Sequence, residues 1–356
     1  MWSSTDTMSL NSHKVAYNMQ EFKYIPQQEL FRCSVELTSA VKCYIMDGVP
    51  QSLEQLRERG IGVAEQNGAL QIVPADGALL QMIFVRVSPK AANYSTQIVA
   101  KSGTRSSVVL CAHTISDERF VTEDNIEIIA ESGASLDILV MQNENSISMH
   151  RQLYRIRQEE RSTLSLNLTT LNGGSISNKI DAQLCGKGIT CELNGLYLAD
   201  GSQTIDTNVN LVHNVGECTS RQLFKGILGG SAKTTFNGEV LVKKDAQKTE
   251  AYQANNNLLV SDMAKAVSQP HLVIYADDVK CSHGSTIGSL AEESLFYMRS
   301  RGISESEARI LQQQAFAGAV LEKISNKELR ERLNNLVERR LRGEETFCRG
   351  CSKNCC

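Results

Sequence analysis

Residues 164–168 read Leu-Ser-Leu-Asn-Leu, with apolar and polar side chains in strict alternation. This period of two is typical of a β-strand that buries one face and exposes the other. Short runs of the same texture recur between Gly, Asn, Asp and Ser, at 126–129, 136–140, 209–212 and 239–242. Long helical periodicity is absent from about residue 80 to residue 287. We therefore predict an all-β region over this part of the chain.

Strands this short suit either a β-sandwich or a β-solenoid. The length of the region would demand two sandwiches, and no linker rich in Pro, Gly and Ser divides it. We therefore predict a solenoid of the parallel β-helix type, with roughly 20 to 25 residues per coil and roughly eight to ten coils. Only five prolines occur in 356 residues, which suits stacked coils whose backbone amides pair with both neighbours.

The pattern becomes helical after residue 288. A first helix is expected over 292–301 and ends at Gly302. Capping boxes at 304–307 (SESE) and 325–328 (SNKE) open a second and a third helix, and the third ends near Gly343. The predicted apolar sides comprise Ala308, Leu311, Ala315, Ala319 and Leu321 in the second helix, and Leu329, Leu333 and Leu336 in the third. Such short helices bury little among themselves, so we expect them to need the β-helix end or a partner.

The chain is thus divided into a mixed α/β region over 1–80, a β-helix over 81–287, a helical docking domain over 288–347 and a Cys-rich tail over 348–356. A possible short helix begins at Ser52 in the first region. The net charge of -3 gives no sign of a nucleic-acid partner. No basic and apolar leader and no membrane-length apolar run occurs, so we expect a cytoplasmic protein without a membrane partner.

The stretch 275–284 (YADDVKCSHG) concentrates ionisable groups after the apolar run 272–275. We interpret it as a strand that ends in an exposed turn. Residues i and i+2 of a strand share a face, so the Cys281 thiol and the His283 imidazole would lie close enough to bind one metal atom. Asp277 and Asp278 are possible accessory ligands. The competing interpretation is a plain turn with a buried Cys and a solvated His.

Eleven cysteines are many, and their odd number argues against a disulfide framework. The isolated ones are expected to be small core residues, namely Cys33, Cys43, Cys111, Cys185 and Cys191. The tail has the spacing C-x2-C-x3-C-C, formed by Cys348, Cys351, Cys355 and Cys356. These soft ligands suit zinc or part of an iron–sulfur cluster, and the alternative is a reduced, flexible tail.

Other motifs support no catalytic or nucleotide site. The run 229–235 (GGSAKTT) resembles a phosphate-binding loop, but Ala232 precedes Lys233 where that loop has Gly. We therefore expect this chain to bind no nucleotide. Neither a G-x-S-x-G nor an H-E-x-x-H motif occurs.

Several longer motifs occur in a fixed order, namely 220–226 (SRQLFKG), 236–238 (FNG), 245–249 (DAQKT), 256–259 (NNLL), 276–284 (ADDVKCSHG) and 295–302 (LFYMRSRG). This series closely resembles the SufB/SufD family of iron–sulfur cluster assembly proteins, and its Lys-Cys-Ser-His-Gly form is similar to the SufD branch. The resemblance is strong from about residue 215 to residue 325 and looser before that.

The resemblance implies a right-handed parallel β-helix that ends in a helical domain. It also implies a scaffold subunit that pairs with a SufB-like chain and a SufC-type ATPase, with a transient cluster or iron atom at the subunit interface. Cys281 and His283 correspond to the family's interface Cys and His. The N-terminal region looks shorter than is usual in that family, and the Cys-rich tail is not a family feature.

Three functions of different classes remain open at this stage. The first is a non-enzymatic scaffold for cluster assembly, for which a homodimer is one alternative state in isolation. The second is a carbohydrate-active β-helix enzyme, although aromatic side chains suited to stacking on sugars are few in the β-region, among them Phe120, Tyr154, Tyr197, Phe224 and Phe236. The third is a hydrolase built on Cys281 and His283, for which no orienting third residue is identifiable.

Overall fold

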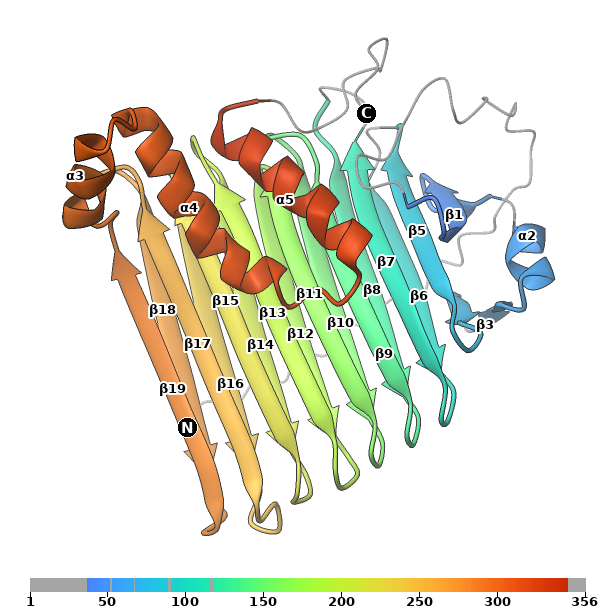
Figure 1. The fold of residues 1–356 in the computed structure, drawn as a ribbon. Helices are drawn as coiled ribbons and strands as arrows, with labels where there is room; N and C mark the ends of the chain where they lie inside the picture. Colours follow the sequence, from blue (N-terminus) through green and yellow to red (C-terminus); the bar gives the residue numbers. More distant parts are fainter. Residues whose placement is uncertain (1–36, 52, 67, 89–90, 115–117, 345–356) are drawn as a thin grey trace, which may run out of the picture.

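Successive strands alternate between two sheets that face each other, which makes a β-solenoid (Figure 1). This computed structural model describes residues 37–344 except 52, 67, 89–90 and 115–117. The ten-stranded sheet has the order β2 (Val49–Pro50), β1 (Val41–Met46), β5 (Leu79–Arg86), β7 (Arg105–Thr114), β9 (Ser135–Asn143), β11 (Thr163–Asn172), β13 (Thr190–Ala199), β15 (Thr219–Leu228), β17 (Thr249–Leu259) and β19 (Val279–Gly288). The nine-stranded sheet has the order β3 (Gly62–Gln66), β4 (Ala69–Val73), β6 (Ala92–Ala100), β8 (Val121–Ala130), β10 (Met149–Gln158), β12 (Ser175–Leu184), β14 (Thr204–His213), β16 (Lys233–Val242) and β18 (Lys265–Ile274).

Each coil is longer than the sequence suggested. Neighbouring coils pair in parallel. The step between paired residues is 39 from β1 to β5 (Val41 with Leu80), and in the other parallel pairs it runs from 26 (Met149 with Ser175) to 32 (Lys233 with Lys265). The solenoid accordingly has about 7 turns, so the predictions of 20 to 25 residues per coil and eight to ten coils were wrong. The reason is that one coil contains two strands of about ten residues, each of which spans about 33 Å, together with two turns.

The N-terminal region contributes strands to both sheets. β1 pairs in parallel with β5, and β4 pairs in parallel with β6, while the β1–β2 and β3–β4 pairs are antiparallel. The sheets therefore begin before residue 81. The short helix expected after Ser52 is α2 (Leu53–Glu58), which buries Leu56.

The main core fills the space between the two sheets. Inward-facing side chains of the two sheets pack against each other there, as shown by Phe224 of β15 and Phe236 of β16, whose ring centroids lie 5.0 Å apart. Glycine makes room for some of these rings. A Cβ on Gly226 would lie 2.0 Å from Cε2 of Tyr197, so a larger residue at this position would displace the tyrosine.

Three helices follow the last strand, namely α3 (Glu292–Ser300), α4 (Glu305–Leu321) and α5 (Lys327–Leu341). The Ser304 hydroxyl caps α4 as predicted. α5 is capped by the side chain of Asn326 and not by Ser325, whose hydroxyl instead donates to Asp137. Leu329, Leu333 and Leu336 are buried as predicted.

The expected buried side of α4 was partly wrong. Ala308 and Leu321 are buried, but Leu311 and Ala315 are exposed, and the helix buries Ala317 and Val320 instead. The sequence indicates which residues are apolar, but the position of the neighbouring sheet decides which of them are covered.

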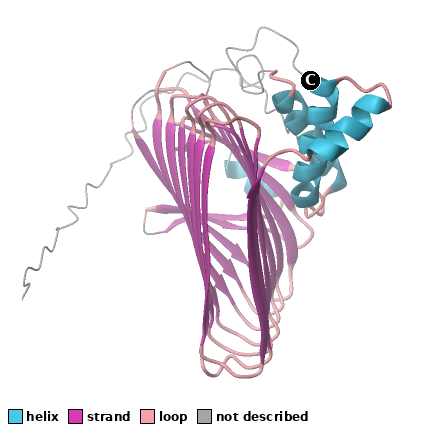
Figure 2. Ribbon diagram, turned by 90° about the vertical axis from the view of Figure 1, so that its left-hand side faces the viewer, coloured by secondary structure: helices cyan, strands magenta, loops and turns pink. Residues whose placement is uncertain are grey.

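The helical lobe packs on the outer face of the ten-stranded sheet (Figure 2). A second apolar cluster joins lobe residues such as Leu321 and Leu333 to sheet residues such as Leu196 and Ile227. Lys225 donates to the Phe316 carbonyl at 3.2 Å, and its Nζ lies 4.4 Å from the Phe316 ring centroid. The apolar faces of the helices are thus covered by the flank of the solenoid, and not by its end. Within the described segments, no helix meets the length and apolarity needed to cross a membrane.

A buried charge cluster lies inside the solenoid. The Nε2 atom of His150 lies 2.7 Å from Oδ2 of Asp124, and its Nδ1 atom lies 3.3 Å from Oε2 of Glu144. All three side chains are buried. Burial alone would lower the pKa of His150, but Glu144 and Asp124 outweigh it and raise the pKa to about 10.

We predict that His150 makes stability depend on pH between about 6.5, its ordinary pKa, and about 10. Its stabilisation is present below the unfolded pKa and is lost as pH rises through the folded pKa. His150→Leu should lower the free energy of unfolding by about 3–5 kcal/mol, because two carboxylates remain buried without a cation. Urea unfolding at about pH 6 and about pH 9 should then show a smaller pH dependence for the variant than for the unmodified chain.

His213 provides a matched control. It is also buried, but its Nε2 atom contacts only the Ser220 hydroxyl, at 2.9 Å, and burial lowers its pKa to about 4. Its contribution to stability is lost only as pH falls below its ordinary value, so His213→Leu should not change the pH dependence above about pH 6.5. An unchanged pH dependence in His150→Leu would contradict the assignment.

Candidate functional site

The candidate site lies on the terminal coil, which β18 and β19 form. β19 is the last strand of the ten-stranded sheet and pairs only with β17, and β18 is the last strand of the nine-stranded sheet. Within the described part of the chain no further coil covers them. Side chains that would be interior in any earlier coil are therefore exposed here.

Cys281 and His283 lie on one face of β19, as predicted. Cys281 is in register with Ala251, and His283 is in register with Gln253. Ala251 and Gln253 are buried between the sheets, so Cys281 and His283 belong to the inward-facing row of the last coil. Cys281 is partly buried against the main core, whereas His283 is exposed.

The predicted local structure of the motif was wrong in one respect. The apolar run 272–274 ends β18, and the motif does not end that strand but begins the next one, in the other sheet. Asp277 and Asp278 lie in the exposed turn between the two strands. The Asp278 N–H donates to Oε1 of Gln247 at 2.8 Å, which ties this turn to the turn of the preceding coil.

The structure does not bring these carboxylates together with Cys281 and His283. No group of three or more His, Cys, Asp or Glu residues able to hold a metal ion occurs in the residues that the structure describes. The four tail thiols, Cys348, Cys351, Cys355 and Cys356, lie outside the described residues, as does Cys33.

The remaining cysteines mostly match the prediction of small core residues. Cys43, Cys111 and Cys191 are buried, and burial raises the pKa of Cys43 and of Cys191 to about 12. Cys185 is partly exposed and not a core residue, because it follows β12 at the start of a turn. Burial also raises the pKa of Cys281, although the Ala251 backbone hydrogen bond lowers it.

The floor of the site is polar, which the sequence analysis missed. Beneath His283, Nε2 of Gln253 donates to Oε1 of Gln222 at 2.8 Å. In the same row, Nδ2 of Asn255 donates to the Tyr197 hydroxyl at 3.0 Å, and that hydroxyl donates to Oδ1 of Asn257 at 2.7 Å. A coil length of about thirty residues would have indicated these neighbours, because His283 follows Gln253 by one coil.

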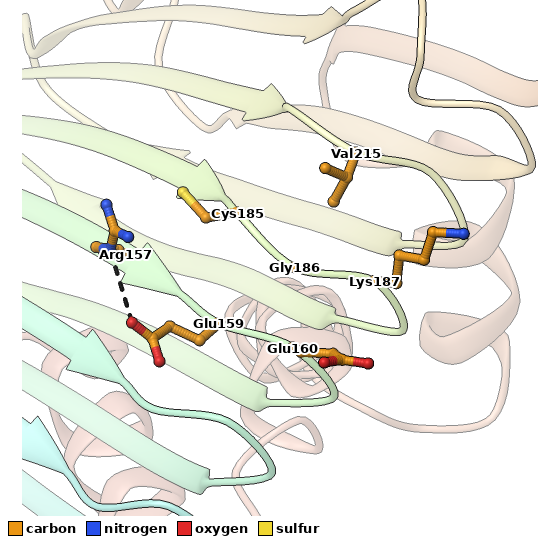
Figure 3. A pocket seen from close by; sticks show the side chains of 7 residues that line it. All are labelled: Arg157, Glu159, Glu160, Cys185, Gly186, Lys187 and Val215. Carbon is orange, nitrogen blue, oxygen red and sulfur yellow. Dashed lines mark ion pairs between the residues drawn. The ribbon is translucent and has the colours of Figure 1, made fainter.

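Two hollows lie on the surface. One, of about 410 Å³, reaches the candidate site, because its lining includes Gln222, Gln253 and His283 as well as Tyr252 and Lys323. The other, of about 420 Å³, is lined by the turns after β10 and β12, and Figure 3 shows Cys185 there, with the Arg157–Glu159 ion pair. The described lining of the second hollow has a thiol but no imidazole.

The strands and the first part of the helical lobe match a known protein family. Residues 84–316, which run from β5 into α4, match the family described as "SUF system FeS cluster assembly, SufBD core domain". The chain belongs to the SufB/SufD family. Within this family, the chain is similar to SufD proteins.

Relatives of this SufB/SufD-family chain occur in distant organisms. The iron–sulfur cluster assembly protein SufD of Escherichia coli is 32% identical over 76% of this chain and 64% of its own length. A chloroplastic protein of Arabidopsis thaliana, ABCI7, is 33% identical over 61% of this chain and 46% of its own length. A SufBD family protein of Synechocystis is 34% identical over 59% of this chain and 47% of its own length. The chain thus spans about half to two thirds of the length of these relatives.

Proposed function

We propose that this chain is a non-enzymatic scaffold subunit on which iron or a nascent iron–sulfur cluster is held at an interface with a second, SufB-like chain. One observation carries the proposal: a thiol and an imidazole lie two residues apart on the inward-facing row of a coil that no further coil covers among the described residues. Thiolate sulfur and imidazole nitrogen both suit iron. The cluster is cargo and is passed on. The energy comes from a SufC-type ATPase, since the run 229–235 of this chain departs from a phosphate-binding loop.

The ligand count supports a shared site. A cluster of either common type usually takes four protein ligands, and β19 provides Cys281 and His283. Asp277 and Asp278 are harder donors and lie in the turn before the strand. The remaining ligands would come from a second chain placed against the terminal coil.

The surface of the terminal coil supports such a partner. Five of the nine large apolar side chains that are exposed among the described residues lie on this coil, namely Met263, Val267, Ile274, Tyr275 and Ile287. The outer edges of β18 and β19 also present backbone groups that no described strand pairs. A second chain would bury the apolar surface and satisfy these groups together. A SufB-like chain would bring a different set of ligands, whereas a homodimer would bring only a second copy of the same ones.

Replacing both proposed ligands should abolish cluster formation without unfolding the protein. Cys281→Ser with His283→Ala removes the two ligands, and the free energy of unfolding should change by no more than about 1 kcal/mol, because His283 is exposed and Cys281 is only partly buried. The measurement is anaerobic reconstitution of the complex with iron and sulfide, read by absorbance. Cys185→Ser is the matched control, since this thiol is also partly exposed. A full cluster yield from the double variant would refute the assignment.

We propose that the ATPase docks on the helical lobe. Its inner side is covered by the sheet, yet α3 exposes Phe296 (74%) and Tyr297 (59%), and α4 exposes Leu311 (38%). Adjacent exposed aromatic residues are typical of the anchors of an interface. Deleting residues 289–356 would uncover the apolar sheet face beneath the lobe, so substitutions of exposed side chains give the sharper test.

Phe296→Ala with Tyr297→Ala should weaken binding of a SufC-type ATPase at least about tenfold, which is about 1.4 kcal/mol, because both rings would lose their burial in the interface. The measurement is a binding titration of the full chain. Ile147→Ser provides a control, since Ile147 is also exposed (52%) but lies in the loop before β10. Unchanged binding in the aromatic double variant would place the docking surface elsewhere.

Cluster formation should require the second chain and not the tail. Removing residues 348–356 deletes all four tail thiols, and reconstitution of the shortened chain should still give a cluster when the SufB-like partner is present. Without the partner it should give little, because too few ligands remain. A partner-independent cluster that survives the deletion would disprove the shared site. A cluster that disappears with the tail would locate the site in the tail.

A further inference from the structure

Three polar side chains form a ladder that ends at the candidate site. Gln222, Gln253 and His283 occupy the same position in three consecutive coils, as the paired residues of β15, β17 and β19. The first step of the ladder carries a side-chain hydrogen bond, from Nε2 of Gln253 to Oε1 of Gln222 at 2.8 Å. The second step repeats this backbone pairing one coil further on, where His283 is in register with Gln253.

One atom of the Gln253 side-chain amide has no hydrogen-bond partner. Gln253 is only 3% exposed, and the unpartnered atom is Oε1. An unpaired buried carbonyl oxygen costs about 1–3 kcal/mol. Because Nε2 already bonds to the preceding coil, Oε1 is the atom of this amide that remains able to accept a hydrogen bond.

The surrounding residues also leave room for this amide. Gly238 faces it from the opposite sheet, and a Cβ at this position would lie 2.3 Å from Nε2 of Gln253. Any larger residue there would force the amide to move. The position of Gln253 therefore depends on a glycine across the core as well as on Gln222.

We propose that Gln253 is a positioning residue for His283, accepting a hydrogen bond from one ring nitrogen so that the other ring nitrogen is free to bind iron. The proposal rests on the proposed function, in which His283 is a ligand. A ligating imidazole is neutral, and the hydrogen bond made by one nitrogen determines which nitrogen is left for the metal. An amide oxygen fixes this choice without adding a buried charge.

Two variants separate this role from simple packing. Gln253→Met keeps the length of the side chain but removes the acceptor, whereas Gln253→Glu keeps an oxygen acceptor. Thr249→Val is the control, because Thr249 lies on the same strand, is fully buried and has an unpartnered hydroxyl, but is in register with Val279. Thermal unfolding of each full-length variant verifies that it is folded.

Two measurements on the full chain test the proposal. Long-range ¹H–¹⁵N NMR of histidine-labelled, metal-free protein reports which ring nitrogen of His283 carries the proton. Anaerobic titration with Fe(II) alone reports affinity. We expect Gln253→Met to lose the preference for one tautomer and to bind Fe(II) at least about tenfold more weakly, and Gln253→Glu to keep both properties, like Thr249→Val.

The outcomes distinguish the two proposals. If Gln253→Met matches Thr249→Val in tautomer and in affinity while His283→Ala loses Fe(II) binding, the positioning role is wrong and the ligand assignment stands. If Gln253→Glu is as impaired as Gln253→Met, the glutamine acts through packing and the positioning role is again wrong. If His283→Ala binds Fe(II) as well as the unmodified chain does, the ligand assignment itself fails.

Discussion

The backbone hydrogen bonds between successive coils are the constraint on which the rest of this structure depends. Each strand from β5 to β17 pairs in parallel on both sides with the strands of the neighbouring coils, and these two rows of pairs fix which side chains face inward. A parallel strand is satisfied only when both edges are covered. The last coil lacks this cover within the described chain, and it is the coil that has Cys281 and His283. The candidate ligands are therefore exposed because they lie on the last strand of the ten-stranded sheet.

The same register brings polar side chains into the interior in rows. Near the first coils, His150 is held between Asp124 and Glu144, and near the last coils the amides of Gln222 and Gln253 are linked. Buried polar groups of this kind need partners placed within a few tenths of an ångström. Stacked strands provide that placement, because a side chain meets its neighbour in the next coil at a fixed spacing. The interior thus contains hydrogen-bonded polar side chains next to the last described coil.

The helical lobe shows how the outer face of a solenoid is used. Its apolar sides cover the ten-stranded sheet, and Lys225 and Arg340 fasten it through hydrogen bonds to the carbonyls of Phe316 and Leu171. Because the sheet covers these sides, the lobe does not need the end of the solenoid for its stability. The terminal coil and the aromatic pair of α3 are then free at the same time. This separation is compatible with the two different partners that we propose.

The sequence alone determined the kinds of element, their order and the chemistry of the motif. Alternation at 164–168 predicted strands, the serine and glycine signals marked the three helices, and i, i+2 spacing placed Cys281 and His283 on one face. These are local properties, decided by residues within a few positions of each other. The tertiary structure decided the coil length, the sheet switch at the turn of Asp277 and Asp278, the cap at Asn326 and the covered side of α4. It also decided that Gln253 lies beside His283, because contacts across coils join residues about thirty positions apart, and nothing local in the sequence indicates which residue will stack on which.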